Sequence, residues 1–170
     1  MSVGLLILRL VVGLSLAAHG AQKLFGWFGG YGIAGTGQFL EQLGFRPGRR
    51  HATQAGIAEV VGGLFLAAGF LTPAAVATLV AVMLVAAVSV HIKSGFFAQS
   101  GGYEYTLVLG GAAVALGFTG PGALSLDRAL GISLSGEIWG LAALAAGLIG
   151  GAVPLLARKT APASTAPNAA

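Results

Sequence analysis

Cysteine is absent from the 170-residue sequence, and charged residues are scarce. Without cysteine, the chain alone cannot form disulfides, thiolate metal sites or iron–sulfur ligation. Charged residues make up 8% of the chain, against roughly 25% in a typical soluble domain. So few charges cannot solvate the surface of a soluble globule. A soluble enzyme, a disordered chain and a nucleic-acid-binding protein are therefore all disfavoured.

Apolar residues and glycine are what the sequence has in excess. Hydrophobic residues account for 56% of the chain and glycine for 29 positions, and the mean hydropathy is +0.88. A helix that spans a bilayer needs about 20 mostly apolar residues. Five stretches meet or approach this length: 3–25, 55–71, 74–92, 103–119 and 138–157. The sequence therefore predicts an all-α fold, a polytopic membrane helix bundle.

The first apolar stretch could also be interpreted as a secretory signal peptide. A signal peptide carries its basic residues ahead of the apolar core. Here no basic residue precedes the stretch, and Arg9 lies inside it. We therefore expect residues 3–25 to form a membrane span.

Basic residues outside the spans indicate how the bundle is oriented. We call the end of the bundle that carries the 26–53 connection the B end, and the end that carries the 121–136 connection the A end. Seven Lys and Arg residues fall at the B end and only Arg128 at the A end. Because basic residues concentrate on the cytoplasmic side, we expect a multi-pass plasma-membrane protein with its amino terminus outside. The 158–170 tail is expected to be cytoplasmic and disordered.

The glycine-rich connection after the first span contains a literal G-x-G-x-x-G pattern over residues 30–35. That pattern binds dinucleotides only between a β-strand and a helix, and a membrane helix precedes it here. We therefore expect a turn at the membrane surface. Thr36 is expected to cap a short interfacial helix over 36–43 that ends at Gly44.

Most of the charged side chains within or next to the spans fall near the B end. Such side chains are costly in a bilayer and mark function by default. Lys23 shares a face of the first span with His19, because the two are four residues apart. Antiparallel packing then brings together two carboxylates, two lysines, two histidines and two tyrosines: Glu59, Glu104, Lys23, Lys93, His19, His91, Tyr103 and Tyr105.

Two interpretations of this cluster stay open. Glu59 with Lys23, and Glu104 with Lys93, could be ion pairs that fix the register of the helices. Alternatively, the cluster forms a ligand or proton site, which its concentration near one end together with aromatic residues favours. At the A end, Arg9 could meet Glu137, which begins the last span.

Haem and metal sites are both disfavoured. Two histidines could ligate haem, but nothing specific to haem accompanies them. A zinc site needs three or more ligands, and the third histidine, His51, lies in the basic connection, where we expect it to be solvated. No metal site is predicted.

Segments at these same positions carry a family resemblance. HGAQKLFG at 19–26 and GGYEY at 101–105 are the most specific of them, within the stretches RLVVGLSLAAHGAQKLFGWFGGYGIAGTGQFLEQLG, AGIAEVVGGLFLAAGFLTPAA, VSVHIKSGFFAQSGGYEYTLVL and GPGALSLDR. Together these stretches resemble the DoxX family of small membrane proteins. The resemblance implies a four-helix membrane domain over 1–130, beyond which the loop and additional span over 131–157 would be a departure. The motif positions that it marks are His19, Gln22, Lys23, Glu59, His91, Tyr103 and Glu104.

The resemblance also bears on function, because some relatives are linked to quinone-coupled oxidation of thiosulfate and others to complexes that handle oxidative stress. The leading hypothesis is a redox-associated membrane subunit with a quinone-like small-molecule site in the cytoplasmic leaflet. Lys23 or His19 would bind an oxygen of the ligand, Glu59 and Glu104 would carry protons, and Tyr103 together with phenylalanine walls would stack on the ring. A partner protein would supply electrons, since the chain has no cysteine, flavin motif or metal cluster of its own.

Two alternatives use the same residues differently. A small-solute transporter would use the charges as a pathway, although only one half of the predicted bundle is rich in them. A structural assembly subunit without its own activity would dock through the small-residue pairs on the last span, such as Gly136 with Gly140. Whether the chain is an enzyme and whether it forms a homo-oligomer stay open.

Overall fold

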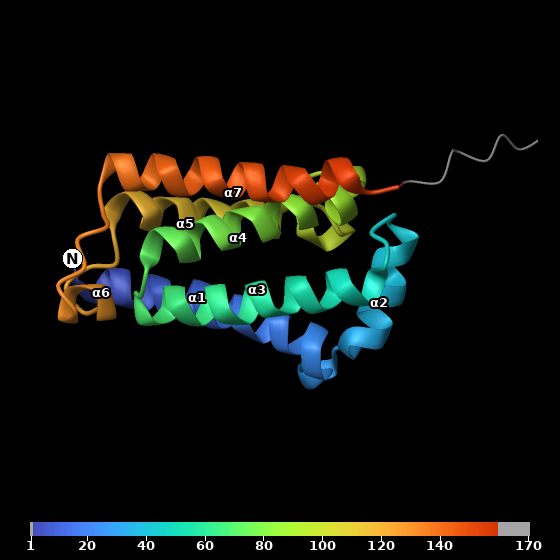
Figure 1. The fold of residues 1–170 in the computed structure, drawn as a ribbon, viewed down its shortest axis with the longest axis horizontal. Helices are drawn as coiled ribbons and strands as arrows, with labels where there is room; N and C mark the ends of the chain where they lie inside the picture. Colours follow the sequence, from blue (N-terminus) through green and yellow to red (C-terminus); the bar gives the residue numbers. More distant parts are fainter. Residues whose placement is uncertain (1, 160–170) are drawn as a thin grey trace, which may run out of the picture.

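The computed structural model describes residues 2–159, which are all-α and contain no strand (Figure 1). This confirms the predicted fold class. The α-helices are α1 (Ser2–Phe25), α2 (Gly32–Gln42), α3 (Gly48–Ala68), α4 (Thr72–Ala86), α5 (Glu104–Thr119), α6 (Leu126–Ala129) and α7 (Glu137–Ala157). Shorter turns are η1 (Trp27–Gly29), the π-helical η2 (Ala87–His91), η3 (Ile92–Ser94) and η4 (Ala98–Ser100).

Each of the five predicted spans is helical, and the span 74–92 covers α4, η2 and the start of η3. Three segments of the described chain are long and apolar enough to cross a membrane: α1, α7 and the continuous run from α4 through η3. The apolar helix α5 is shorter, at 16 residues. Helix α3 begins at Gly48, earlier than predicted, because its polar first two turns are helical and follow an extended Pro47. It ends at Ala68, where Gly69 takes a left-handed conformation.

The helices form two layers along a common axis (Figure 1). Helix α1 packs along α3, and α7 packs along α4 with α5 beside both. A Cβ atom at Gly63 would lie 2.5 Å from the Gly13 carbonyl oxygen, so the α1 and α3 backbones are in direct contact. Small residues permit such close approach between membrane helices. The core between the layers contains Leu16, Leu66, Leu79 and Leu116, all fully buried.

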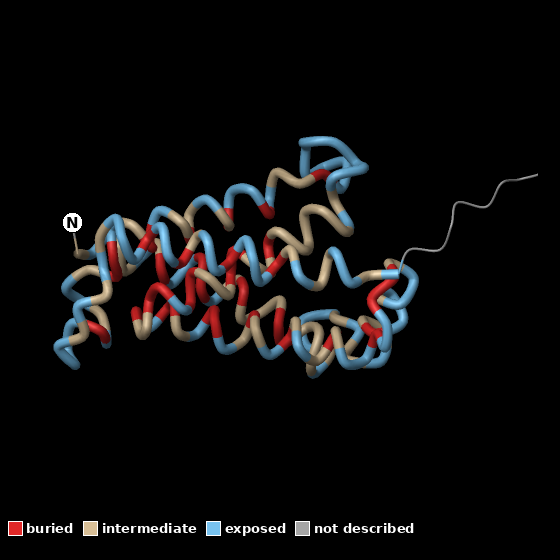
Figure 2. Tube along the Cα trace, turned by 45° about the horizontal axis from the view of Figure 1, so that its top comes forward, coloured by how far each residue is buried: buried red, intermediate tan, exposed pale blue. Residues whose placement is uncertain are grey.

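Buried residues line the faces where helices meet, and exposed residues cover the outside of the bundle (Figure 2). Many of these outward-facing residues are large and apolar, including Ile7, Leu14, Ile149 and Val153. Apolar residues on the outer surface match a lipid environment, because lipid tails are as apolar as these side chains.

At the A end, the short α6 closes the bundle through Asp127. Its carboxylate accepts hydrogen bonds from the Leu71 N–H at 2.7 Å, the Thr72 N–H at 3.0 Å and the Thr72 hydroxyl at 2.7 Å, which caps α4. Arg9 is completely buried and donates to the Leu124 carbonyl oxygen; it lies near Asp127 but forms no salt bridge in the described chain. The predicted meeting of Arg9 with Glu137 is therefore wrong, and the Glu137 side chain is exposed.

Helix α2 crosses the B end of α3 (Figure 1). It begins at Gly32 rather than at Thr36, which lies inside the helix. The glycines at 26, 29 and 32 have positive φ angles, so the chain has already turned before Thr36. Within the described residues the G-x-G-x-x-G segment follows a helical turn and no strand, as expected.

The end of α7 is fixed to the connection between α2 and α3. The Lys159 N–H donates to the Gly44 carbonyl oxygen at 2.9 Å. The first two residues of the predicted disordered tail are therefore held against the protein. The remainder of that predicted tail, 160–170, lies outside the described residues.

Candidate functional site

Lys23 and Glu59 form the salt bridge of the B end. The Lys23 Nζ lies 2.6 Å from the Glu59 Oε2, and their side chains are 28% and 4% exposed. Lys23 occupies the last turn of α1, and Glu59 lies midway along α3. One turn earlier on α1, a Cβ atom at Gly20 would lie 2.7 Å from the Gly56 carbonyl oxygen, so the two helices are already in contact there. The predicted pairing of Lys23 with Glu59 is confirmed as a contact.

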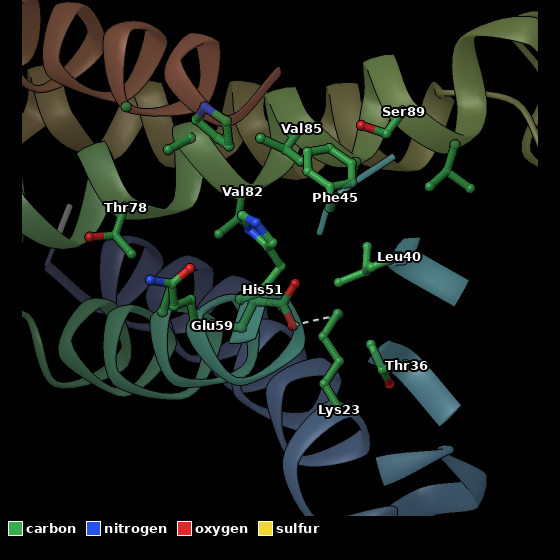
Figure 3. A pocket seen from close by; sticks show the side chains of 18 of the residues that line it. Lys23, Thr36, Leu40, Phe45, His51, Glu59, Thr78, Val82, Val85 and Ser89 are labelled. Atoms are coloured by element: carbon green, nitrogen blue, oxygen red, sulfur yellow. Dashed lines mark hydrogen bonds and ion pairs between the residues drawn. The ribbon is translucent and has the colours of Figure 1, made fainter. Parts of the chain in front are cut away.

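A cavity of about 630 Å³ lies beside this ion pair (Figure 3). We call it the B-end cavity. Helix α4 forms its floor, α3 and α7 form two walls, and α2 with Phe45 lies at one end. Its lining is mostly apolar and includes Phe39, Leu40, Phe45, Ala58, Ala77, Ala81, Val82, Val85, Ala146, Gly150 and Pro154. Polar members of the lining are few: Lys23, Thr36, His51, Gln54, Glu59, Thr78, Ser89 and His91.

His51 belongs to the cavity, contrary to the expectation that it is solvated. It is half-buried, and its ring packs against Phe45 with the ring centroids 5.6 Å apart. His51 lies two helical turns before Glu59 on α3, which places both residues on the same face. His51 was not predicted as a site residue, because the basic first turns of α3 were interpreted as a connection. Continuing the helical spacing backward from Glu59 would have identified it.

Ser89 offers a free hydroxyl to the same cavity. It lies in the π-helical turn η2, and its Oγ is buried without a hydrogen-bond partner in the described chain. A buried polar atom without a partner costs free energy, so each instance calls for an explanation. Short π-helical turns inside α-helices are frequent at functional sites.

His19 and Gln22 lie outside the cavity. The His19 Nδ1 lies 3.1 Å from the Gln22 Oε1, and its Nε2 lies 3.3 Å from the Tyr105 hydroxyl on α5. The Gln22 amide donates to the Phe28 carbonyl oxygen at 3.1 Å. These bonds link α1 to α5 and to the turn that follows α1. His19 still interacts electrostatically with Glu59 but does not line the B-end cavity.

Tyr103 and Glu104 fold the connection between α4 and α5. Glu104 accepts a hydrogen bond from the Ala98 N–H at 2.9 Å, so its predicted pairing with Lys93 is wrong. Lys93 is exposed and forms no salt bridge in the described chain. Tyr103 packs edge-on against Phe96 and lines a separate cavity of about 210 Å³ between α4 and α5.

His91 contacts both the connection between α4 and α5 and the B-end cavity. Its Nδ1–H donates to the Gly101 carbonyl oxygen at 2.7 Å, which fixes the ring against the connection, and the residue also lines the B-end cavity. Of the seven candidates from the sequence, the structure therefore brings Lys23, Glu59 and His91 to one cavity. Within residues 2–159, no group of three or more His, Asp or Glu residues could hold a metal ion.

The model of one protein family, DoxX, matches residues 4–92, just over half of the chain. The chain belongs to the DoxX family. This confirms the resemblance, and with the three long apolar helices it makes the chain a DoxX-family membrane protein. No curated protein and no solved structure matches the chain. The match includes α1 to α4 and the Lys23–Glu59 pair, whereas α5 and α7 lie beyond it.

Proposed function

We propose that this DoxX protein is a redox-associated membrane subunit whose B-end cavity binds a quinone or a chemically similar molecule. The observation that carries the proposal is the Lys23–Glu59 pair in the wall of an otherwise apolar cavity of about 630 Å³. Small-molecule sites are mostly apolar, with a few placed polar groups, and measure roughly 300–1,000 Å³. The Lys23–Glu59 pair joins α1 to α3, and because it lines the cavity it can also bind a ligand there.

The residues around the cavity suit a ring that bears oxygen atoms. The Lys23 ammonium has three N–H donors and gives one of them to Glu59, so others remain for a ligand oxygen. The Ser89 hydroxyl is a second unused donor. Phe45 and the exposed Phe39 supply apolar walls for the ring, whereas Tyr103, which was also predicted to stack on it, does not line this cavity.

Reduction of a bound quinone to the quinol consumes two electrons and two protons. In this proposal Lys23 orients and hydrogen-bonds one oxygen, and the Glu59 carboxyl group holds a proton beside it. His51 and His91 line the same cavity and lie between Glu59 and the B end, so they offer a route for protons. Electrons come from a partner redox protein, since the chain contains no cysteine for an iron–sulfur cluster.

The proposal extends to the membrane arrangement. We place the five long helices α1, α3, α4, α5 and α7 across the plasma membrane, with the amino terminus outside and the B end in the cytoplasmic leaflet. The excess of basic residues at the B end supports this orientation. Within the described residues, the A-end charges Arg9 and Asp127 are buried and line neither of the two cavities, which does not favour a pathway for a transported solute.

Extraction of bound quinone tests the proposal. The protein is purified from its native membrane, washed in detergent, extracted with organic solvent and assayed for quinone by mass spectrometry. We expect quinone to co-purify with the wild type and to be depleted in Glu59→Gln. Glu104→Gln is the matched control, because it makes the same chemical change outside the cavity. Repeated wild-type preparations without quinone would overturn the proposal, and solute flux into proteoliposomes without a partner would favour the transporter.

A further inference from the structure

The B-end cavity is long and polar in one half only. Its lining extends along α4 and into η2, from Ala77 to Val90, which corresponds to ~20 Å at the helical rise per residue. A Cβ atom at Gly62 would lie 3.0 Å from the Thr78 Cγ2, so Thr78 is level with the turn of α3 that follows Glu59, farther from the B end. The four titratable lining residues all lie level with Glu59 or nearer the B end: Lys23, His51, Glu59 and His91.

The other half of the cavity, toward the A end, offers no free polar group. We call it the inner half, and its lining residues are Ala77, Thr78, Ala81, Ala146 and Gly150. The Thr78 hydroxyl already donates to the Ala74 carbonyl oxygen at 2.9 Å within α4. A small polar ligand bound at Glu59 would leave the inner half unfilled, and the atoms lining an empty apolar space lose their dispersion contacts.

The B end of the cavity is covered by protein. Phe45 is 3% exposed, and Leu40 of α2 lies beside it in the lining. The hydrogen bond from the Lys159 N–H to the Gly44 carbonyl oxygen holds the end of α7 against this cover. The cavity therefore has no wide opening toward the aqueous surface at the B end.

The side between α3 and α7 is the open one. Helix α3 packs against α1, α2 and α4, and α7 packs against α4 and α5, but α3 and α7 do not pack along each other. Both helices nevertheless contribute to the lining, α3 through residues such as His51 and Glu59, which Figure 3 labels, and α7 through Ala146, Gly150 and Pro154. Ala146 and Gly150 of α7 remain exposed at this side. In a membrane bundle this open side faces lipid.

We propose that the ligand of the B-end cavity carries a long apolar chain and enters sideways from the bilayer, between α3 and α7. Its head lies at Lys23 and Glu59, and its chain lies in the inner half against α4 and α7. This inference rests on the proposed function and specifies the class of ligand. It gives α7, which lies outside the family match, the role of selecting the chain.

Two photoreactive benzoquinones with decyl chains test the inference in phospholipid nanodiscs. One carries a diazirine next to the ring and the other at the end of the chain. We expect the ring probe to label residues 51–59 or 85–91, and the chain-end probe to label residues 77–81 or 146–150. Chain-end labelling at 36–45, or only on outward-facing positions, with ring labelling intact would overturn this inference and leave the proposed function standing. Absence of cavity labelling by both probes would overturn both.

A pair of alanine variants on α7 provides the second arm. Ala146→Leu fills the inner half of the cavity, whereas Ala145→Leu adds the same bulk at an exposed position outside the lining. We expect Ala146→Leu to weaken binding of decyl-benzoquinone about tenfold, because overpacking excludes the chain. Binding of the same ring without a chain should change less than about twofold. Equal losses for both compounds, or equal effects of both variants, would contradict the inference.

Discussion

The two ends of this bundle bury opposite charges in contrasting ways. At the A end, Arg9 and Asp127 are 0% and 1% exposed, and Asp127 accepts three hydrogen bonds. At the B end, Glu59 is equally buried, but its partner Lys23 is 28% exposed and both residues line a cavity. The two A-end charges are enclosed by the protein without a salt bridge between them, whereas the B-end pair borders a space that a ligand can enter.

The contrast shows that a buried charge in this bundle does not by itself indicate chemistry. Asp127 caps α4 and joins α6 to the α3–α4 connection, so its role is fully explained by structure. Lys23 retains unused N–H donors, and nearby Ser89 has an unpartnered hydroxyl. The Arg9 Nε and Nη1 atoms are also buried without a partner in the described chain, so what distinguishes the Lys23–Glu59 pair is its position in the wall of a cavity.

The largest expected effect on stability comes from Asp127→Ala at the A end. The change removes the acidic neighbour of the buried Arg9. It also leaves the N–H groups of Leu71 and Thr72 and the Thr72 hydroxyl without their hydrogen-bond acceptor. We expect the free energy of unfolding to fall by about 3–5 kcal/mol, measured by chemical denaturation in detergent micelles. The protein that remains folded should bind quinone as the wild type does. Loss of binding at wild-type stability would show that the two ends have been assigned the wrong roles.

Glu59→Ala should lower the free energy of unfolding less than Asp127→Ala does, and it should lower the affinity for quinone more. It removes one charge-assisted hydrogen bond, and the partly exposed Lys23 can extend its ammonium group toward water. We expect a loss of about 1–2 kcal/mol in the free energy of unfolding and a loss of at least about tenfold in quinone affinity. If Glu59→Ala destabilises the protein as strongly as Asp127→Ala and leaves quinone binding intact, the Lys23–Glu59 pair is structural.

Ser89→Ala should reduce binding without reducing stability. The hydroxyl has no partner in the described chain, so its removal leaves the melting temperature unchanged or slightly higher. If the hydroxyl donates to the ligand, affinity falls by about 1 kcal/mol, or roughly fivefold. Titration of a quinone into the purified variant measures this, and unchanged affinity would exclude Ser89 from the site.

Tyr105→Phe should have the smallest effect. It removes one hydrogen bond to His19 on an exposed side chain outside the cavity. We expect a change of less than about 0.5 kcal/mol in unfolding free energy and no change in quinone affinity. A loss of affinity comparable to that of Glu59→Ala would show that His19 contributes to the binding site.

The features that could be predicted from the sequence are those that follow from its hydropathy pattern. Runs of apolar residues located every long helix, and opposite charges at similar depth identified Lys23 and Glu59 as partners. Which helix faces pack together was not predictable, because contacts such as that of Gly13 with Gly63 resemble many other small-residue pairs.

The wrong predictions arose where polar side chains bond to the backbone rather than to an opposite charge. Glu104 accepts from the Ala98 N–H of its own connection rather than pairing with Lys93, and Arg9 donates to the Leu124 carbonyl oxygen rather than pairing with Glu137. His51 was missed because the polar start of α3 carries no hydropathy signal. In each case the deciding partner is a backbone group or a ring, which charge patterns do not reveal.

The most direct test of the central claim compares two carboxylates by the same change. Binding of decyl-benzoquinone is titrated in nanodiscs for the wild type, Glu59→Gln and Glu104→Gln. Glu59→Gln should weaken binding by at least about tenfold, and Glu104→Gln should stay within about twofold of the wild type. Equal affinities for all three proteins, or a larger loss in Glu104→Gln, would contradict the assignment of the B-end cavity as the site.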